Sequence, residues 1–492
     1  MAKRKADELP TEAPEEKRPA GAEASEKLPQ PPYTAASAED RAMALSDPPL
    51  VFKLDATCGR ARASTVILPH GEVLTPVFMP VGTQGTIKGM SSEDMRALGC
   101  KILLGNTFHL ANRPTCDLLD KCGGLHNFMQ WSGNILTDSG GFQMVSLLKL
   151  AEITEQGVEF EDPKKEGSRM LLTPEKSIES QNSIGGDIIM ALDDVVSSTI
   201  TDMDRIKEAT DRTLRWVDRC ISAHRKPHSQ NLFGIVQGHL DPDLRESSLK
   251  EMIKRNFPGY AIGGLSGGEA KDSFWRVVEQ CTRPGTGLPA DKPRYLMGVG
   301  YPLDIVVCVA LGVDMFDCVY PSRTARFGTA LLRTGQMRLT SNEFATDHRP
   351  LEVGGTGPLK DYTRAMLHTI VTKEPVAASL ITQHNLHFML TLLSEMREQI
   401  RNNTFNEWVR KFLQDFFPSA RPAPCSACPP RWVRSALEAC GIGLDDIFDW
   451  SAAEELPDMP RDSSNAPGGN KEGKKPEAKG KAAAAVAPED AS

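Results

Sequence analysis

The sequence predicts an α/β fold: a closed (β/α)8 barrel of the TIM type, followed by a helical extension and flanked by disordered tails. Three observations lead to this prediction. Short apolar runs alternate with longer segments whose apolar residues recur every three or four positions, which is typical of parallel strands joined by helices. Seven clear runs, with VFMPVGT (77–83) as the candidate for an eighth, favour a closed barrel. No GxGxxG motif follows a run and opens a helix, so the open dinucleotide-binding sheet lacks its signature.

The predicted strands and helices can be placed in order along the chain. The strands are VFMPVGT (77–83), KILLG (101–105), NILTD (134–138), DIIMALD (187–193), NLFGIVQ (231–237), YAIGG (260–264), RYLMGVG (294–300) and VDMFD (313–317). The helices are the periodic segments 173–185, 203–225, 242–256, 269–281 and 301–312. The region from about 340 to 420 follows the last strand and is the predicted helical extension.

Both ends of the chain differ in composition from the middle. Residues 1–48 and 451–492 are rich in Glu, Lys, Pro and Ala and poor in large apolar residues, so we expect both tails to be disordered. Residues 49–450 are then one folded domain. The first tail has charges where a signal peptide needs an apolar stretch, and no window approaches eighteen consecutive apolar residues. We therefore expect a soluble, cytoplasmic protein.

The charge balance and the cysteines narrow the class of protein further. The formal net charge is -8, so a nucleic acid would have to bind a local basic patch and not the protein as a whole. Lys3, Arg4 and Lys5 with Lys17 and Arg18 resemble a nuclear-import signal only weakly, because acidic residues are interleaved with them. The 11 cysteines are scattered, several within apolar runs, as expected of free thiols in a reducing compartment.

Polar or glycine residues follow the C-terminal ends of most predicted strands. They are Asn106, Asp138, Asp193, Asp194, Gln237, Gly263, Gly264, Gly298, Gly300 and Asp317. In a barrel these ends converge on one rim, which is where barrel enzymes carry out their chemistry. The sequence therefore predicts an active site at this rim.

Two of these residues, Asp138 and Asp317, are a minimal pair for chemistry at a sugar C1 carbon. One carboxylate attacks the anomeric carbon, and the other handles the proton of the departing or arriving base. Phe142, in the same TDSGGFQ motif as Asp138, could stack on a planar heterocycle. Taken alone, this motif is equally well a strand-to-helix turn in which Asp138 or Ser139 caps the next helix and Phe142 is a core residue.

Three further segments suggest how a substrate is recognised. Asp193 could accept two N–H donors from a purine-like ring, with Gln237 and the backbone of GGLSGG (263–268) completing the pocket. A phosphate-binding loop is the weaker interpretation of GGLSGG, because no GK[ST] follows. Asp194 is more readily explained as a helix cap or an ion-pair partner. PSRTARFG (321–328), directly after Asp317, offers arginines for flanking phosphates, or is an ordinary basic loop.

Taken together, these motifs closely resemble the tRNA-guanine transglycosylase family. The similarity runs from about Phe52 to about residue 415 and from Trp432 to Gly443, through PVFMPVGTQGTIKGM, LGNTFHL, LTDSGGFQMVSL, DIIMALDDVVSS, NLFGIVQGHL, YAIGGLSGGE, YLMGVGYPLD and DMFDCVYPSRTARFG. The resemblance implies a barrel enzyme that exchanges guanine for queuine at the anticodon wobble position of tRNA. It implies that Asp317 is the nucleophile of a covalent ribosyl-enzyme intermediate and that Asp138 is the general acid/base.

The resemblance also implies the binding residues and the partners. The base pocket would comprise Asp138, Ser139, Gly140, Gly141, Phe142, Asp193, Gln237 and Gly264. The tRNA contacts would come from Gly298, Val299, Gly300, Tyr301, Pro302, Leu303, Asp304, Ser322, Arg323, Thr324, Ala325 and Arg326. Because the non-catalytic sister subunit of this family typically lacks the carboxylates, we expect a catalytic subunit that works in a heterodimer or a homodimer. Peripheral association with the mitochondrial outer membrane is compatible with the family.

The family's structural zinc site, Cys-x-Cys-x2-Cys followed by a histidine, is incomplete in this chain. Gly355, Gly357 and Leu359 stand where cysteines are expected, and His384 alone matches a ligand. Zn2+ is therefore expected from the family but in doubt here, since a structural site needs four ligands. The pair Cys425 and Cys428 has zinc-like spacing but stands at the wrong place in the chain.

Two other functions fit parts of this pattern. The chain could be a degenerate tRNA-binding scaffold whose turnover has been lost together with the zinc ligands. A glycoside hydrolase acting on free sugars shares the two carboxylates, but it would use aromatic sugar platforms, and the aromatic content is only 6%.

Overall fold

The computed structural model describes residues 49–141, 151–161, 169–371, 373–418 and 428–450. All of them belong to one compact unit of the chain, Ala36–Ser492. The predicted tails, residues 1–48 and 451–492, lie outside the described residues, as do Phe142 and Cys425.

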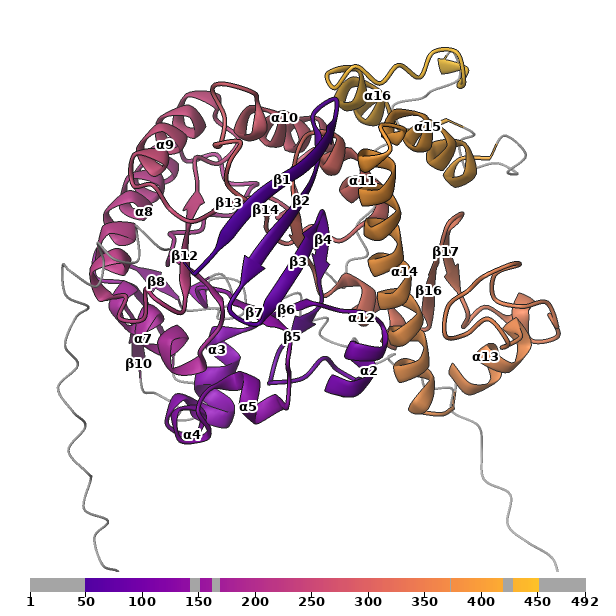
Figure 1. Cartoon of the computed structure of the whole chain (residues 1–492), viewed down its shortest axis with the longest axis horizontal. Helices are drawn as coiled ribbons and strands as arrows, with labels where there is room; N and C mark the ends of the chain where they lie inside the picture. The colour runs from indigo at the N-terminus through magenta and orange to yellow at the C-terminus, as the bar shows by residue number, and fades with distance from the viewer. Residues whose placement is uncertain (1–48, 142–150, 162–168, 372, 419–427, 451–492) are drawn as a thin grey trace, which may run out of the picture. The chain divides into compact units, whose positions relative to one another are not determined.

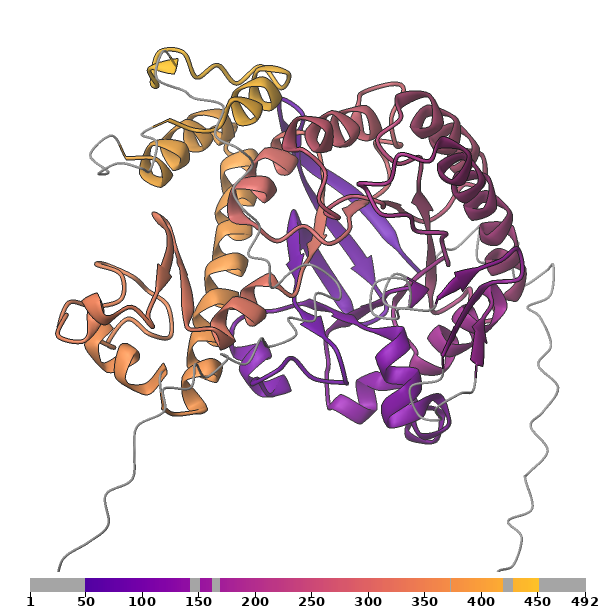
Figure 2. The ribbon, with the colours of Figure 1, turned by 180° about the vertical axis from the view of Figure 1, so that it is seen from behind.

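A sheet of parallel strand segments forms the centre of the fold (Figures 1 and 2). Its order is β4-β15-β14-β13-β12-β11-β7-β6-β5. The segments are β4 (Val77–Met79), β5 (Val81–Gly82), β6 (Ile102–Gly105), β7 (Asn134–Thr137), β11 (Ile188–Met190), β12 (Asn231–Val236), β13 (Tyr260–Ile262), β14 (Arg294–Leu296) and β15 (Met315–Asp317). The two end segments, β4 and β5, are consecutive in the chain on either side of Pro80. The sheet therefore returns on itself with eight strand positions, which confirms the predicted barrel.

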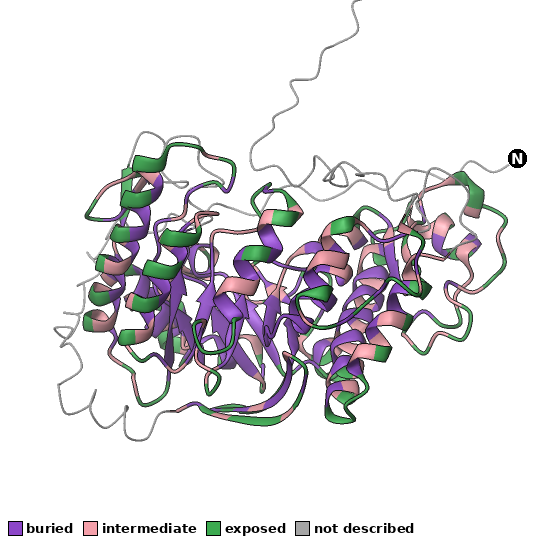
Figure 3. Cartoon of the chain, turned by 90° about the horizontal axis from the view of Figure 1, so that it is seen from above, coloured by how far each residue is buried: buried purple, intermediate pink, exposed green. Residues whose placement is uncertain are grey.

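Helices surround the barrel where the sequence predicts them. The crossovers are α7 (Pro174–Ile184), α8 (Met203–Ala223), α9 (Pro242–Lys254), α10 (Lys271–Thr282) and α11 (Pro302–Ala310). Their starts are encoded locally: the Asp202 and Asp241 side chains accept hydrogen bonds from backbone N–H groups of the first turns of α8 and α9. In Figure 3 the helices expose their outer faces and bury the faces that cover the strands.

Several elements between the barrel strands were not predicted. Between β5 and β7 lie α2 (Ser92–Ala97), α3 (Thr107–Leu110), a π-helical stretch (Ala111–Thr115), α4 (Cys116–Cys122) and α5 (Leu125–Met129). An antiparallel sheet of β8 (Glu152–Ile153), β9 (Val158–Glu161) and β10 (Arg169–Leu172) is inserted between β7 and α7.

An antiparallel sheet closes the N-terminal end of the barrel. It consists of β1 (Val51–Cys58), β2 (Ala61–Leu68) and β3 (Gly71–Thr75). Val66, Leu68 and Val73 of this sheet join the apolar cluster of the barrel interior, which includes Phe233 and Tyr295. The barrel is thus filled with side chains, so its chemistry is confined to the opposite rim.

The predicted helical extension is also present. Within it lie α13 (Arg364–Val371), α14 (Val376–Arg401) and α15 (Phe405–Phe416), while α12 (Tyr320–Arg326) precedes it and α16 (Arg431–Glu438) follows it. A hairpin of β16 (Thr329–Leu332) and β17 (Gly335–Arg338) and a 3-10 turn (Asn342–Phe344) stand between α12 and α13. The long helix α14 packs against β1, β2 and β4 and so joins this extension to the barrel. Among the described residues, no helix is both long and apolar enough to span a membrane.

Candidate active site

Asp317 is the last residue of β15 and stands at the C-terminal rim. Its Oδ1 accepts hydrogen bonds from the Tyr295 hydroxyl at 2.5 Å and from the Gly298 backbone N–H at 2.8 Å. Burial raises the pKa of the Asp317 carboxyl, against the opposing effect of these two hydrogen bonds. Both contacts use the same oxygen, so among the described residues Oδ2 carries no recorded hydrogen bond.

Asp138 follows β7 and is held at the start of α3. Its Oδ2 accepts a hydrogen bond from the Asn106 side-chain amide at 2.8 Å, and its Oδ1 accepts one from the Thr107 backbone N–H at 2.8 Å. Burial, Asp317 and Asp138 all raise the pKa of the Tyr295 hydroxyl, so both carboxylates lie within electrostatic reach of this tyrosine. Asp138 and Asp317 thus both stand at the C-terminal ends of barrel strands, as the sequence predicts.

The predicted base pocket begins with Asp193. The Gln237 side-chain amide donates to Asp193 Oδ2 at 2.7 Å, and the Ser139 hydroxyl donates to Oδ1 at 3.4 Å. Burial raises the pKa of Asp193 to about 6. Gly264 approaches so closely that a Cβ there would lie 2.4 Å from Gln237 Oε1, and its φ of +72° favours glycine. Four of the predicted pocket residues therefore meet in one buried cluster.

The rest of the predicted pocket adjoins this cluster. A Cβ at Gly141 would lie 2.8 Å from the Leu192 side chain, so the turn after Asp138 passes close to the end of β11. Gly140 has a φ of +80° and completes that turn. Asp194 has a different role: Arg205 and Arg212 of α8 each reach its carboxylate at 2.6 Å. The ion-pair interpretation of Asp194 is confirmed.

The two predicted tRNA-contacting segments differ in exposure along their length. Val299, Gly300, Pro302, Asp304, Ser322 and Ala325 are buried, Tyr301, Leu303, Arg323 and Thr324 are half-buried, and Gly298 and Arg326 are exposed. The Tyr301 ring lies 4.2 Å from the Tyr320 ring, and Asp304 forms an ion pair with Lys271. The buried residues thus support a small exposed surface next to Asp317.

Two residues around the carboxylates were missed as functional partners. Tyr295 lies inside a strand that reads as apolar, and its signal is a buried hydroxyl, which needs a hydrogen-bond partner. Asn106 was placed on the rim, but its bond to Asp138 depends on the pairing of β6 with β7.

The region expected to bind zinc lacks the necessary donors. Gly355 and Gly357 have no side-chain donor, and Leu359 is 1% exposed within an apolar cluster. The Nε2 atom of His384 lies 2.8 Å from the backbone oxygen of Leu331, and this hydrogen bond holds the imidazole. A structural zinc site needs four ligands. The residues present therefore do not fit zinc.

One group of three metal-type donors, His70, His126 and Asp187, occurs in the described ranges. It lies at the N-terminal end of the barrel strands, away from the rim that carries Asp317. His70 Nδ1 is 2.6 Å from Asp187 Oδ1, His126 Nε2 is 3.1 Å from Asp187 Oδ2, and the two rings stack at 3.7 Å. The nitrogens that face the carboxylate are already hydrogen-bonded to it. This group is a hydrogen-bonded cluster, and no motif in the sequence indicates it because its three residues come from distant segments.

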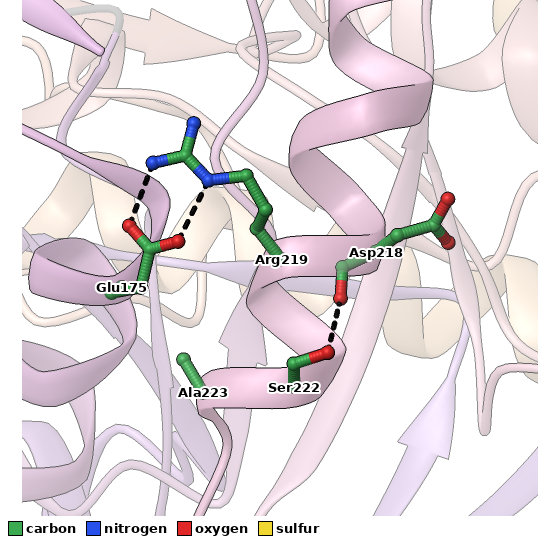
Figure 4. A pocket seen from close by; sticks show the side chains of 5 residues that line it. All are labelled: Glu175, Asp218, Arg219, Ser222 and Ala223. Atoms are coloured by element: carbon green, nitrogen blue, oxygen red, sulfur yellow. Dashed lines mark hydrogen bonds and ion pairs between the residues drawn. The ribbon is translucent and has the colours of Figure 1, made fainter. Parts of the chain in front are cut away.

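A surface hollow lies over α7 and α8, and no residue of the rim lines it (Figure 4). It is lined by Glu175, Asp218, Arg219, Ser222 and Ala223, and Arg219 pairs with Glu175 at 2.7 Å. These residues belong to the barrel's outer helices and not to strand ends, so the hollow takes no part in the candidate site.

Fold and site together define the class: a (β/α)8-barrel enzyme with two carboxylates and a cluster of hydrogen-bonded polar residues at its C-terminal rim. The family model described as queuine tRNA-ribosyltransferase matches residues 56–418. The chain belongs to this family.

Curated relatives agree over most of their length. The queuine tRNA-ribosyltransferase catalytic subunit of Schizosaccharomyces pombe is 53% identical over 412 residues, covering 82% of this chain and 100% of that protein. The catalytic subunit of Caenorhabditis elegans is 48% identical over 399 residues, covering 79% of this chain and 98% of its own. The queuine tRNA-ribosyltransferase of Staphylococcus aureus (strain bovine RF122 / ET3-1) is 44% identical over 373 residues, covering 75% and 97%.

Proposed function

We propose that this chain is the catalytic subunit of a tRNA-guanine transglycosylase that replaces guanine with queuine at the anticodon wobble position. The observation that carries the proposal is the hydrogen bonding of the Asp317 carboxylate. Its Oδ1 is held by Tyr295 and Gly298, while Oδ2 is left to act as the nucleophile. A carboxylate fixed by neutral donors keeps its negative charge uncompensated, which suits attack on a carbon that becomes positive in the transition state.

The proposed reaction has two displacement steps. In the first, Asp317 attacks the ribose C1′, the glycosidic bond breaks, and its electron pair leaves with guanine, which Asp138 protonates. In the second, Asp138 removes a proton from the incoming base, whose nitrogen attacks C1′ and releases the Asp317 carboxylate. The hydrogen bonds from Asn106 and Thr107 fix both oxygens of Asp138 for these transfers.

Asp193 and Gln237 are the proposed base-recognition residues. The Gln237 side-chain amide donates to Asp193 Oδ2 at 2.7 Å, which orients the carboxylate for N–H donors of a base. A buried carboxylate that can accept two N–H groups selects a ring with adjacent donors. Ser139, Gly140, Gly141, Phe142 and Gly264 are proposed to shape the same pocket, and the exposed part of residues 298–304 and 322–326 is proposed to contact tRNA.

The test is the exchange assay combined with trapping of the intermediate. The unaltered protein, with its partner subunit where one is required, should incorporate labelled guanine or queuine into tRNA and form a covalent protein–tRNA adduct resolved on a denaturing gel. Asp317→Asn should form no adduct, and Asp138→Asn should slow exchange by roughly 10²- to 10⁴-fold. Equal exchange by Asp317→Asn and the unaltered protein would refute the proposal.

A tRNA-binding scaffold is the second candidate, and the missing zinc ligands at Gly355, Gly357 and Leu359 favour it. The scaffold predicts tRNA binding without base exchange. The hydrogen-bonded setting of both carboxylates favours the enzyme, because a scaffold has no need of two acids oriented by hydrogen bonds at the rim.

We further propose that the chain works in the cytoplasm as a heterodimer with a non-catalytic sister subunit. Co-purification with that subunit, followed by measurement of the mass of the complex in solution, distinguishes the heterodimer from a homodimer.

A further inference from the structure

The segment between α12 and α14, residues 329–371, contains β16, β17 and α13, and we call it the hairpin module (Figures 1 and 2). Its interior is an apolar cluster separate from the barrel core. The cluster comprises Ala325, Ala330, Leu332, Leu339, Leu351, Leu359, Leu367 and Ile381, all 5% exposed or less. Leu359, which stands where a cysteine was expected, is thus part of a small hydrophobic core, and burial of apolar surface is the main stabilising contribution in such a core.

Polar contacts close the loop that carries Leu359. Leu351 N–H donates to the Tyr362 backbone oxygen at 3.2 Å, and a β-bridge joins Pro350 to Thr363. These contacts bring the two arms of the loop together with backbone bonds alone. A structural metal stabilises a fold by closing a loop of this kind.

Asp347 ties the base of the same loop. Its backbone oxygen accepts a hydrogen bond from Ala365 N–H at 2.8 Å. Its carboxylate pairs with Arg364 at 3.1 Å and with Arg349 at 2.7 Å. We call this group the Asp347 clamp. Because the clamp joins the start of the loop to the start of α13, the loop is anchored without any metal ligand.

His384 has the environment of a hydrogen-bonded core residue. It is 6% exposed, and its Nε2 lies 2.8 Å from the Leu331 oxygen. A Cβ at Gly357 would lie 3.6 Å from His384 Nδ1. The loop therefore still passes the imidazole, but it presents a residue without a side chain.

The thiolates that zinc would need cannot come from nearby in the sequence. Residues 319–424 contain no cysteine. Cys428 belongs to the large core cluster and not to that of the hairpin module. Among the described residues, His384 is in no group of three or more metal-type donors.

We propose that the hairpin module folds without a metal ion. The apolar cluster around Leu359 and the Asp347 clamp close the loop in place of zinc, and the His384 side chain is hydrogen-bonded to the Leu331 backbone oxygen. This proposal concerns stability alone and stands apart from the proposed reaction.

The first test measures zinc in the purified full-length protein after gel filtration, and its thermal unfolding with and without EDTA. We expect far less than one zinc per chain and the same melting temperature in both buffers. One zinc per chain that is lost in His384→Gln, together with a melting temperature lowered by EDTA, would overturn the proposal. Zinc that His384→Gln leaves in place is bound elsewhere and leaves the proposal standing.

The second test asks whether the apolar cluster holds the loop. Leu359→Ala is compared with Met366→Ala, a matched truncation in the same module at a side chain that is 46% exposed. Leu359→Ala should lower the melting temperature by about 5 °C or more, and should speed amide hydrogen exchange in residues 350–365. Met366→Ala should change both little. Equal effects of the two variants would show that the apolar cluster does not replace the metal.

Discussion

Aspartates stand at both ends of the barrel, and those proposed to act on the substrate differ from the others in what compensates their charge. At the N-terminal end Asp314 pairs with Arg62 at 2.5 Å, and two histidines contact Asp187. At the C-terminal rim Asp317 and Asp193 bond only to neutral hydroxyl, amide and backbone donors in the contacts described above. The pKa of Asp187 is lowered, mainly by its histidine hydrogen bonds against the cost of burial, whereas burial raises the pKa of Asp193 and Asp317. Asp194, also at the rim, is paired with Arg205 and Arg212. Pairing with a cation, and not the end of the barrel, therefore separates the structural aspartates from the proposed functional ones.

The largest expected effect separates activity from stability at the rim. Asp317→Asn should reduce base exchange by about 10³-fold or more, as removal of a nucleophile does. It should leave the melting temperature unchanged or raised, because it removes a half-buried charge whose hydrogen-bond partners are all neutral. Calorimetry and the exchange assay on the same sample measure both. A marked loss of stability would place Asp317 with the structural aspartates.

The opposite result is expected at the other end of the barrel. Asp314→Ala leaves the buried Arg62 without its carboxylate, which should lower the free energy of unfolding by about 3–5 kcal/mol. The exchange rate per folded molecule should stay the same, because Asp314 is at the start of β15 and not at its reactive end. Chemical denaturation gives the first quantity, and the assay corrected for folded fraction gives the second. A rate loss greater than the loss of folded protein would contradict this.

Removal of the Tyr295 hydroxyl, one of the two hydrogen-bond donors to Asp317, should reduce the exchange rate less than the loss of Asp317 itself. The hydrogen bond from Tyr295 lowers the pKa of Asp317 against the effect of burial, so Tyr295→Phe should raise that pKa further. The acid limb of the pH–rate profile should then move to higher pH, and the rate at pH 7 should fall by roughly tenfold. Phe233→Leu, a change to another side chain of the barrel interior, is the control for altered packing. An unchanged acid limb would show that the contact does not tune Asp317.

Base binding should depend on pH through Asp193. Its pKa of about 6 means that the carboxyl becomes protonated as the pH falls below 6 and then accepts one N–H fewer. The KM for the base should therefore rise as the pH falls through 6, while kcat changes less. Asp193→Asn should have a high KM at every pH. A KM independent of pH between 5 and 8 would rule out Asp193 as the acceptor.

The smallest effect is expected at His70. Its hydrogen bond to Asp187 raises the pKa of His70, so the stabilisation is fully present below pH 6.5 and is lost as the pH rises through the higher folded-state value. Because His70 is partly exposed, His70→Ala should cost less than about 1 kcal/mol at pH 6 and less still at pH 8.5. Urea denaturation at the two pH values measures this. A loss of unfolding free energy in His70→Ala that grows with pH would contradict a raised pKa for His70.

The barrel could be predicted because each of its strands is a local feature. KILLG, NILTD and VDMFD are apolar runs that end in a polar or glycine residue, and buried parallel strands have this pattern wherever they pair. The same feature located Asp138 and Asp317 on the rim. Beyond that, the resemblance supplied their proposed roles.

The neighbours of these residues could not be predicted in the same way, because they depend on how distant segments pair. The register of β14 and β15 pairs Tyr295 with Met315, which is two residues before Asp317. The Tyr295 hydroxyl therefore reaches the Asp317 carboxylate. Asn106 reaches Asp138 through the pairing of β6 with β7. The ion pair of Arg62 with Asp314 joins residues from opposite ends of the domain. Each contact depends on strand register and not on local composition.

The fixed orientation of Asp317 has a stereochemical consequence in the proposed reaction. Since Tyr295 and Gly298 both hold Oδ1, a single oxygen is left to form the bond to C1′ and later to leave it. Each displacement inverts that carbon, and two inversions restore it. The new base is therefore attached on the same face of the ribose as the old one, and the nucleoside keeps the β configuration that the anticodon needs for pairing.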